Sequence, residues 1–239
     1  MSAYIDIGNS NIKVMDEKLC IHVFQTKNFE PKNITNVLLG SDNVVIVGVV
    51  SDVVTNIGVL CQNLGKSFSV ISLKSKLSFK HNLEGIGIDR LVAVEGGITF
   101  FDPPFVVIDA GTAITVDFVV KEGESYVFKG GVIIPGFELC FKSLNDYTAL
   151  LPRLKPIPPK GIYGTDTMNA MNCGICFTIA GGIKDVIKRT EDNLGLSNMK
   201  IIITGGAGKF LGNLLELKHE YVENLIFRGM MNIYNGRGA

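Results

Sequence analysis

The sequence predicts an α/β protein made of two similar domains. Its 239 residues suit two domains of roughly 100–150 residues, each with its own core. An apolar strand that ends in Asp-x-Gly occurs twice, as Ile5-Asp6-Ile7-Gly8 and as Ile108-Asp109-Ala110-Gly111. Strand and helix patterns follow both copies. Two such domains would form a cleft between them.

Each half begins as a three-stranded meander. After each Asp-x-Gly, a second strand pattern follows, at 11–15 and at 114–120, so both copies are predicted to be β-hairpins with a tight glycine turn. A third strand is expected near 20–25 and near 126–134, where Gly130-Gly131 permits a bulge. The duplicated hairpin therefore predicts two sheets of related topology.

The rest of the first half predicts a buried strand and two helices. Residues 44–50 are rich in β-branched side chains, which is typical of a buried parallel strand, and a helix capped by Ser51 or Asp52 follows. A second helix is expected over 88–100, and Pro103-Pro104 cannot continue it. We therefore place the domains at 1–102 and 103–239.

The second half predicts one long helix and a strand–turn–helix unit. Apolar residues at three- and four-residue spacing indicate an amphipathic helix over 165–189, with Thr165 or Asp166 near its start. The strand 200–204 runs into Gly205-Gly206-Ala207-Gly208 and another helix, an arrangement suited to binding a ligand. A closing helix is expected over 221–234, and the proline-rich segment 151–164 is expected to be an irregular loop, either a lid or an interface.

Composition favours a small-molecule partner in the cytoplasm. Lys plus Arg and Asp plus Glu both count 23, and no tract concentrates the basic residues, so neither nucleic acid nor an anionic membrane is an expected partner. Uninterrupted apolar runs are short, and no secretory signal is read at the N-terminus. Five scattered cysteines are typical of a reducing compartment.

The segment Asp6-Ile7-Gly8-Asn9-Ser10-Asn11-Ile12-Lys13 has the composition of a phosphate-binding hairpin. Its glycine lets backbone N–H groups approach an anion, Asn and Ser add donors, and Lys13 adds a positive charge. Asp6 at the strand end is placed to hold Mg²⁺ beside the phosphates. Taken alone, Gly8-Asn9 is equally typical of a hairpin turn that binds nothing.

The second copy, Asp109-Ala110-Gly111-Thr112-Ala113-Ile114-Thr115, strengthens the phosphate interpretation. Two facing hairpins could hold the phosphates of a nucleotide from both sides, with the turn at Thr204-Gly205-Gly206-Ala207-Gly208 as a third loop. Ordinary turns in an α/β protein remain the alternative.

The motifs taken together resemble the type III pantothenate kinases, which have duplicated RNase H-like domains of the actin-like ATPase superfamily. The resemblance covers essentially the whole chain. It rests on the order of Asp6-Ile7-Gly8-Asn9-Ser10, Gly87-Ile88-Asp89-Arg90, Asp109-Ala110-Gly111-Thr112-Ala113-Ile114-Thr115, Gly130-Gly131 with Pro135-Gly136, Gly164-Thr165-Asp166-Thr167 and Thr204-Gly205-Gly206.

The resemblance implies a role for each of these motifs. Residues 6–13 and Thr112 would bind ATP with its Mg²⁺, and Asp109 would help to bind a monovalent cation, K⁺ or NH₄⁺. Gly87, Ile88, Asp89, Arg90 and Thr167 would bind pantothenate, with Asp89 as the catalytic base. The phosphoryl group would pass from ATP to pantothenate, the first step of coenzyme A biosynthesis, in a homodimeric enzyme whose interface could include the long helix.

Phosphoryl transfer is consistent with these residues. It requires mainly positioning and charge neutralisation, with a carboxylate that accepts the proton of the attacking hydroxyl. Arg90 has the planar fork that matches a substrate carboxylate or a transferring phosphoryl group. Without the resemblance, Asp89-Arg90 would be interpreted as the solvated start of a helix.

The segment before Gly87 departs from the family pattern. Lys80 stands where the family has a tyrosine, and Leu83 replaces a proline that follows Asn82. Either Phe79 supplies the aromatic contact or the substrate pocket is altered. The departure keeps two alternatives open, namely a kinase of another small alcohol or sugar and a non-catalytic nucleotide-binding regulatory protein.

The cysteines and histidines predict no metal site. Cys173 and Cys176 lack a second pair of ligands, so they are interpreted as small apolar residues of the long helix. Of the three histidines, His81 lies near the expected substrate segment and is the one with a possible binding role.

Overall fold

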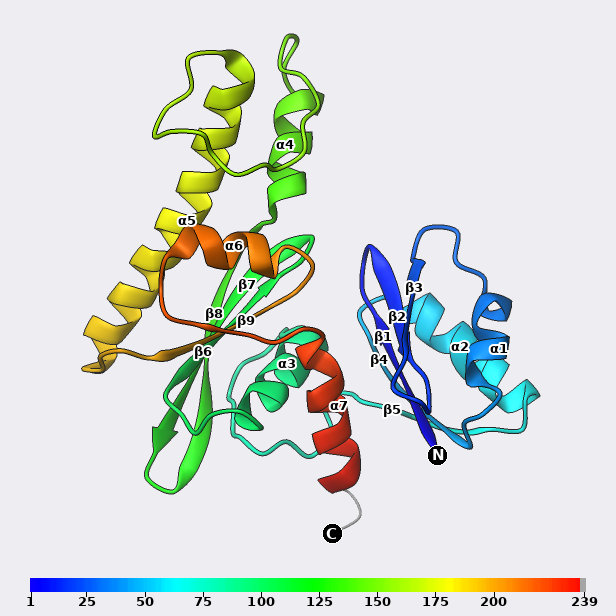
Figure 1. The fold of residues 1–239 in the computed structure, drawn as a ribbon. Coiled ribbons are helices and arrows are strands. Elements are labelled where there is room, and N and C mark those ends of the chain that lie inside the picture. Colours follow the sequence, from blue (N-terminus) through cyan, green and yellow to red (C-terminus); the bar gives the residue numbers. More distant parts are fainter. Residues whose placement is uncertain (237–239) are drawn as a thin grey trace. The chain divides into compact units, whose positions relative to one another are not determined.

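The computed structural model describes residues 1–236 of the chain (Figure 1). It divides into two compact units. Among the described residues, the first contains Met1–Phe100 and 225–236, and the second contains Phe101–Asn224. Residues 237–239, which the sequence analysis counted in the C-terminal domain, lie outside the described residues.

The first unit contains a mixed five-stranded sheet in the order β3-β2-β1-β4-β5. Strand β1 is antiparallel to β2 and parallel to β4. The strands are β1 (Ser2–Ile7), β2 (Asn11–Met15), β3 (Ile21–Gln25), β4 (Asn43–Gly48) and β5 (Ser67–Val70). The helices are η1 (Pro31–Ile34), α1 (Thr35–Leu38), α2 (Ser51–Asn63), α3 (Ile88–Ile98) and α7 (Leu225–Asn235).

Helices cover both faces of this sheet because its central strands are apolar on both sides. Ala3, Ile5 and Ile7 of β1 pack with residues of α1 and α2, which lie together beside the blue strands in Figure 1. On the other face, Tyr4 and the inner residues of β4 pack with α3 and α7. The first unit is therefore an α/β/α layered structure.

The second unit repeats this topology. Its sheet has the order β10-β9-β6-β7-β8, with β6 antiparallel to β7 and parallel to β9. The strands are β6 (Phe105–Ala110), β7 (Ala113–Glu122), β8 (Ser125–Pro135), β9 (Lys200–Thr204) and β10 (Glu220–Tyr221). The helices are α4 (Phe137–Asp146), α5 (Thr167–Leu194) and α6 (Gly208–Leu215).

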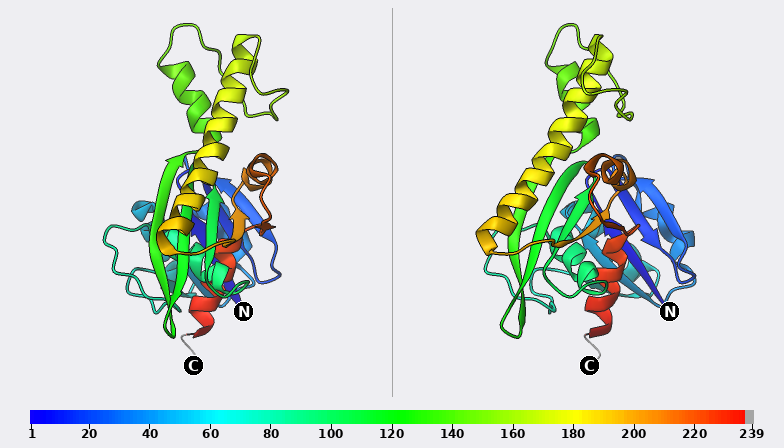
Figure 2. Two further views of the ribbon diagram at one scale, coloured as in Figure 1. Left: turned by 90° about the vertical axis from the view of Figure 1, so that its left-hand side faces the viewer. Right: turned by 60° about the vertical axis from the view of Figure 1, so that its left-hand side comes forward.

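Helix α5 is partly a core helix of the second unit. Its residues from Cys176 to Ile187 pack with β6, β7, β9 and α6 in one apolar cluster. Figure 2 shows its C-terminal half beside the sheet and its N-terminal half extending past the strands, next to α4. Burial raises the pKa of the Cys176 thiol to about 11, and the neighbouring Cys173 adds to the shift. These thiols are packed as apolar groups.

The length and composition of α5 would also suffice for a membrane span. It has 28 residues, and an 18-residue window reaches a mean hydropathy of 1.3. Polar residues interrupt every apolar run of the helix, so the short runs in the sequence did not predict such a helix. Since the packing of α5 against the sheet accounts for its apolar face, we interpret it as a helix of a globular unit.

Most predicted elements are confirmed, with shifted ends. The strand 200–204 is β9, and the helices expected over 88–100 and 165–189 are α3 and α5. The expected helix 221–234 begins only at Leu225, after the short strand β10. The expected division placed this helix in the domain 103–239. In the structure, α7 belongs to the first unit, because its apolar face packs against α3 and β1.

Candidate functional site

The first hairpin presents a polar turn between two strands. The backbone N–H of Gly8 donates to the carbonyl of Asn11 (3.0 Å), and Thr26 at the end of β3 holds the turn through its hydroxyl, which donates to the carbonyl of Gly8 (2.7 Å). The N–H of Thr26 also donates to the carbonyl of Ser10 (3.0 Å). Asn9, Ser10 and Asn11 are exposed in this braced turn.

Two of the predicted ATP-binding residues are packing residues. The side chains of Ile7 and Ile12 are buried in the core with α1 and α2, and they are paired across β1 and β2. Only their backbone groups can therefore contact a ligand. Their apolar side chains orient the hairpin so that the polar residues between them face outward.

Asp6 and Lys13 lie on the face of the first sheet that carries α3. They are cross-strand partners, so their side chains leave the sheet on the same side. Side chains alternate along a strand, and Tyr4, two residues before Asp6, packs with α3 and α7. Asp6 is also in register with Val47 of β4, which packs in the same cluster as Ile88 at the start of α3. The structure thus brings the first hairpin and the Gly-x-Asp-Arg motif to one face of one unit.

Helix α3 begins at this motif and fixes the carboxylate of Asp89. Gly87 is the N-cap residue, and the Oδ1 atom of Asp89 accepts the backbone N–H of Arg90 (2.9 Å). A Cβ atom at position 87 would lie 2.4 Å from this Oδ1 atom, so the carboxylate position requires glycine there. A carboxylate in the first turn is also stabilised by the positive end of the helix dipole.

The second hairpin places Asp109 among threonines. Asp109 on β6 is in register with Thr115 of β7 and with Thr204 of β9. Its neighbours Ile108 and Ala110 pack toward α5 and α6, so Asp109 and both threonines share the opposite face of the second sheet. Where the first hairpin has a lysine opposite the aspartate, the second has hydroxyl groups.

Glycine turns surround Asp109 closely. Gly205 has φ of +89°, and a Cβ atom there would lie 2.4 Å from Oδ1 of Asp109 and 2.6 Å from the backbone of Ala110. Only glycine allows this approach. The N–H of Ala207 donates to the carbonyl of Ala110 (2.9 Å), which fixes the third turn beside the second hairpin.

The amino ends of two helices flank the same hairpin. Gly136, the N-cap residue of α4, donates its N–H to the carbonyl of Thr112 (2.9 Å). Helix α6 begins at Gly208, directly after the turn that contacts Ala110. Free N–H groups and the helix dipole make helix amino ends favourable for anions. Thr112 is exposed between them.

Thr167 lies at a different part of the second unit. It is the first residue of α5 and is exposed, at the end of the helix that extends past the sheet (Figure 2). Asp166 caps the helix by accepting the N–H of Asn169 (2.9 Å), and this bond holds the pKa of its carboxyl below the ordinary value. The second unit by itself does not bring Thr167 to Asp109.

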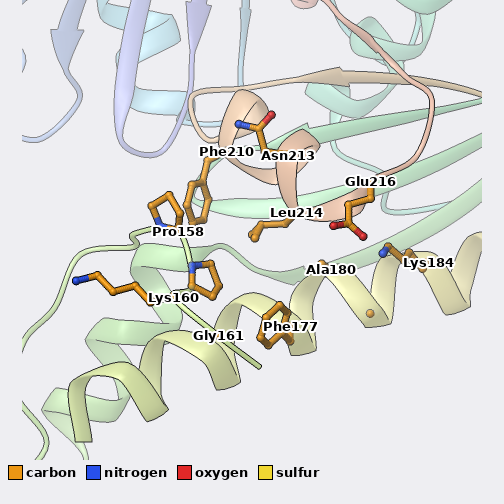
Figure 3. Close-up of a pocket in the computed structure, with 12 residues that line it drawn as sticks. Pro158, Lys160, Gly161, Phe177, Ala180, Lys184, Phe210, Asn213, Leu214 and Glu216 are labelled. Carbon is orange, nitrogen blue, oxygen red and sulfur yellow. The ribbon is translucent and has the colours of Figure 1, made fainter. Parts of the chain in front are cut away.

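A cavity of about 720 Å³ lies between α5, α6 and the proline-rich loop (Figure 3). Phe177 of α5 and Phe210 of α6 line it, and Lys184 and Glu216 add charged groups. The loop is irregular, as predicted, and it is anchored by the buried Asn172, whose amide bonds both the N–H (3.2 Å) and the carbonyl (2.7 Å) of Ile157.

A magnesium site made by the protein alone is not present in residues 1–236, since nowhere in that range do three His, Cys, Asp or Glu side chains gather as ligands. A magnesium ion would therefore take its other ligands from phosphate and water, as Mg²⁺ commonly does. Asp6, at the end of β1, is a carboxylate that fits this arrangement.

Comparison with known proteins identifies the family. Residues 3–189 match the family model described as type III pantothenate kinase. A type III pantothenate kinase of Fusobacterium nucleatum is 34% identical over 195 residues, which cover 77% of this chain and 74% of that protein. This chain belongs to the type III pantothenate kinase family.

Solved structures agree with the fold of this pantothenate kinase family member. A conserved Campylobacter jejuni protein assigned to the Baf family of transcriptional activators is 26% identical, with a TM-score of 0.69 over 99% of this chain and 98% of that one. The archaeal actin homologue Ta0583 has a TM-score of 0.51 at 10% identity, over 99% of both chains. The predicted actin-like architecture with two mixed sheets is confirmed.

Sequence reasoning missed several residues that shape the site of this pantothenate kinase family member. Thr26, which braces the first turn, lies outside any motif, and no sequence signal identified it. Gly136 and Thr204 belonged to recognised motifs, but their contacts with the second hairpin depend on the pairing of distant segments. The burial of Phe79, which is 6% exposed, leaves its ring little surface for a substrate.

Proposed function

We propose that this protein is a pantothenate kinase that transfers the γ-phosphate of ATP to the terminal hydroxyl of pantothenate. The observation that carries the proposal is the shared face of the first unit, where the hairpin residues Asp6 and Lys13 lie on the same side of the sheet as the start of α3. Membership of the type III pantothenate kinase family supports the choice of substrate.

Each of the two hairpins offers groups that can bind the phosphates of ATP. The braced first turn offers the exposed donors of Asn9, Ser10 and Asn11, and Lys13 supplies positive charge. The second hairpin offers Thr112 between two helix amino ends. Magnesium, held through the carboxylate of Asp6, would neutralise charge on the transferring phosphoryl group.

Asp89 acts as the general base. Its carboxylate orients the hydroxyl of pantothenate and accepts its proton as the oxygen attacks the γ-phosphorus and the bond to the β-phosphate oxygen breaks, releasing ADP. Arg90 binds the substrate carboxylate through its guanidinium fork. Gly87, Ile88 and the exposed Thr167 complete the substrate contacts.

Asp109 helps to hold a monovalent cation, K⁺ or NH₄⁺. Its carboxylate lies beside the hydroxyl-bearing residues Thr115 and Thr204 and the close backbone of Gly205. Oxygen atoms of carboxylate, hydroxyl and carbonyl groups suit a hard cation. The cation would stabilise the second hairpin against the phosphates.

The nucleotide base enters the cavity between α5 and α6. Phe177 and Phe210 offer aromatic surface, while Asn213 and Glu216 offer polar groups for a ring amino group. Helix α6 begins directly after the glycine turn beside Asp109, and its later residues line this cavity.

We further propose a cytoplasmic homodimer that uses the extended end of the second unit. Large apolar side chains are exposed there just after α4, in the proline-rich loop and at the start of α5, among them Tyr147 (88%), Leu150 (91%), Ile162 (85%), Tyr163 (79%) and Met168 (56%). A concentration of exposed apolar side chains in one part of the chain is typical of a protein interface. A two-fold symmetric contact would bury it.

The test is ADP release from magnesium ATP, measured with and without pantothenate, in potassium and in sodium buffer. Pantothenate-dependent release that requires potassium is the expected result. Sugars and glycerol serve as alternative acceptors, because Lys80 and Leu83 depart from the family pattern. ADP release that depends on another alcohol would overturn the assignment of pantothenate as the substrate. ATP binding without any acceptor-dependent release would overturn the assignment as an enzyme.

A further inference from the structure

Glu95 is a buried carboxylate in the C-terminal half of α3. It is 1% exposed and lies six residues after Asp89 on the same helix. Burying a carboxylate is costly unless hydrogen bonds replace its water. An apolar side chain would fill a core position of this helix at no such cost, so the presence of Glu95 calls for a role in the structure around it.

Three uncharged donors satisfy the carboxylate. The Oε2 atom accepts the backbone N–H of Ser78 (3.0 Å), and the Oε1 atom accepts the hydroxyl of Ser78 (2.5 Å) and the side-chain amide of Asn232 (2.6 Å). Both carboxylate oxygens are thus used. Glu95 therefore binds both the backbone and the side chain of Ser78, and its bond with Asn232 connects α3 to α7.

Ser78 begins the segment that leads into the Gly-x-Asp-Arg motif. Phe79, the next residue, is 6% exposed, and its ring centroid lies 6.4 Å from that of His81. The Nδ1 atom of His81 is buried and has no hydrogen-bond partner. The contacts of Glu95 attach Ser78 to α3, so they fix the start of the segment 79–87 relative to the helix that carries Asp89.

We propose that Glu95 is a positioning residue that sets the acceptor side of the active site by clamping Ser78. The proposal rests on the proposed function, because the acceptor is taken to be pantothenate. Glu95 itself touches no reacting atom. It acts through Ser78, and the contact with Asn232 makes the C-terminal helix α7 part of the support.

Two substitutions at position 95 separate hydrogen bonding from packing. In Glu95→Gln, the amide oxygen can accept the N–H of Ser78, and the amide nitrogen can donate to the Ser78 hydroxyl and to Asn232 once the Asn232 amide turns over. In Glu95→Leu, side-chain volume is similar but the N–H of Ser78 has no acceptor. Glu95→Gln should therefore rescue what Glu95→Leu loses.

The kinetic test compares KM for pantothenate with KM for ATP in both variants. For Glu95→Leu we expect the pantothenate KM to rise about tenfold or more, in line with the loss of hydrogen bonds to a charged group, while the ATP KM stays within about twofold. Glu95→Gln should remain within about threefold for both. Equal increases in both constants, or no increase in Glu95→Leu, would overturn the proposal.

Hydrogen exchange of backbone amides tests the clamp without any turnover. Peptides that cover 72–87 should exchange faster in Glu95→Leu than in wild type, and Glu95→Gln should resemble wild type. Absence of pantothenate-dependent activity in the wild type would reject the proposed function. The exchange measurement would still test whether Glu95 clamps Ser78, because it requires no turnover. Unchanged exchange in Glu95→Leu would reject the clamp.

If Glu95→Leu does not fold, Ser78→Ala carries the test. It removes only the hydroxyl contact, so we expect a threefold to tenfold rise in the pantothenate KM, an ATP KM unchanged within about twofold, and a near-normal melting temperature. Ser67→Ala, at an exposed position of β5, is the matched control and should change neither KM. An unchanged pantothenate KM in Ser78→Ala would reject the clamp.

Discussion

The two hairpins have the same topology and different chemistry. Both belong to sheets in which the hairpin strand pairs with an antiparallel neighbour on one side and a parallel strand on the other. Opposite the strand-end aspartate, the first has Lys13, whereas the second has Thr115 and Thr204. The two hairpins therefore share one backbone arrangement, and the residues paired with the aspartate determine which ligand each can bind.

The surroundings of the hairpins differ as well. The first is braced by Thr26 and shares its face with α3, which brings Asp89 and Arg90. The second is enclosed by glycine turns and helix amino ends. We infer that the first unit carries the chemistry and the charge of the phosphate site, and that the second mainly holds the nucleotide and its cation.

The largest effect should come from removing the base in the first unit. Asp89→Asn keeps the shape of the side chain but cannot accept a proton, so we expect kcat to fall about 10²- to 10⁴-fold. ATP affinity, measured by calorimetry, should stay within about threefold. If the Asp89→Asn protein had wild-type turnover, Asp89 would not be the base. The proposed difference, in which the first unit carries the chemistry, would then be weaker.

Lys13 tests whether charge distinguishes the hairpins. Lys13→Met keeps the apolar stem and removes the charge, and we expect kcat/KM for ATP to fall about 10- to 100-fold, since hydrogen bonds to charged groups are worth about 1.5–3 kcal/mol. Thr115→Val, at the corresponding position of the second hairpin, should cost less than tenfold. Lys18→Met, in the turn between β2 and β3, is the control. Equal losses at both hairpins would break the comparison.

Asp109 tests the assignment of the cation to the second unit. In Asp109→Asn we expect turnover to lose its preference for potassium over sodium and the ATP KM to rise about tenfold, because one charged ligand is lost. Turnover is measured across a series of potassium chloride concentrations at constant ionic strength. Asp185→Asn, which removes a surface ion pair on α5, controls for general charge effects. A wild-type potassium response would place the cation elsewhere.

Phe177 tests the base cavity of the second unit. Its ring is 43% exposed, so Phe177→Leu should fold normally while it loses part of the aromatic surface. We expect the ATP KM to rise about threefold to tenfold, consistent with about 1 kcal/mol for an aromatic contact, with the pantothenate KM unchanged. Phe68→Leu, exposed on the first unit, is the control. An unchanged ATP KM would exclude this cavity as the base site.

The smallest effect concerns the other end of the first hairpin. Asp16 accepts N–H groups of Lys18 and Cys20 and pairs with His22 (2.9 Å), and chiefly the bond with His22 lowers the pKa of its carboxyl. A lowered pKa contributes stability above the ordinary value of about 3.9 and loses it as pH falls through the folded-state value.

Asp16→Asn should therefore lower the free energy of unfolding by less than about 1 kcal/mol at pH 7, because the turn is at the surface. The difference from wild type should shrink as the pH falls below about 4. Urea unfolding at both pH values measures it. If the difference in unfolding free energy between wild type and Asp16→Asn grew as the pH fell, the lowered pKa of Asp16 would be contradicted.

Local sequence was sufficient for much of the fold. The paired Asp-x-Gly hairpins, the β-branched run of β4 and the spacing of apolar residues in α5 each depend on neighbours within a few residues, so their patterns could be read directly. The strand β10 and the helix α4 had weaker patterns and were not predicted. The position of α7 was also misjudged, because its partner α3 lies far away in the sequence.

The sequence by itself determined the duplicated α/β architecture, the order of the motifs and the family, because these depend on residue types and spacing. Only the tertiary structure decided that Asp6 and Asp89 share a face, that Gly205 closes on Asp109, and that Glu95 holds Ser78. These relations come from strand register and from helix packing between distant segments. Many pairings are compatible with one local pattern, and burial of the whole core selects among them.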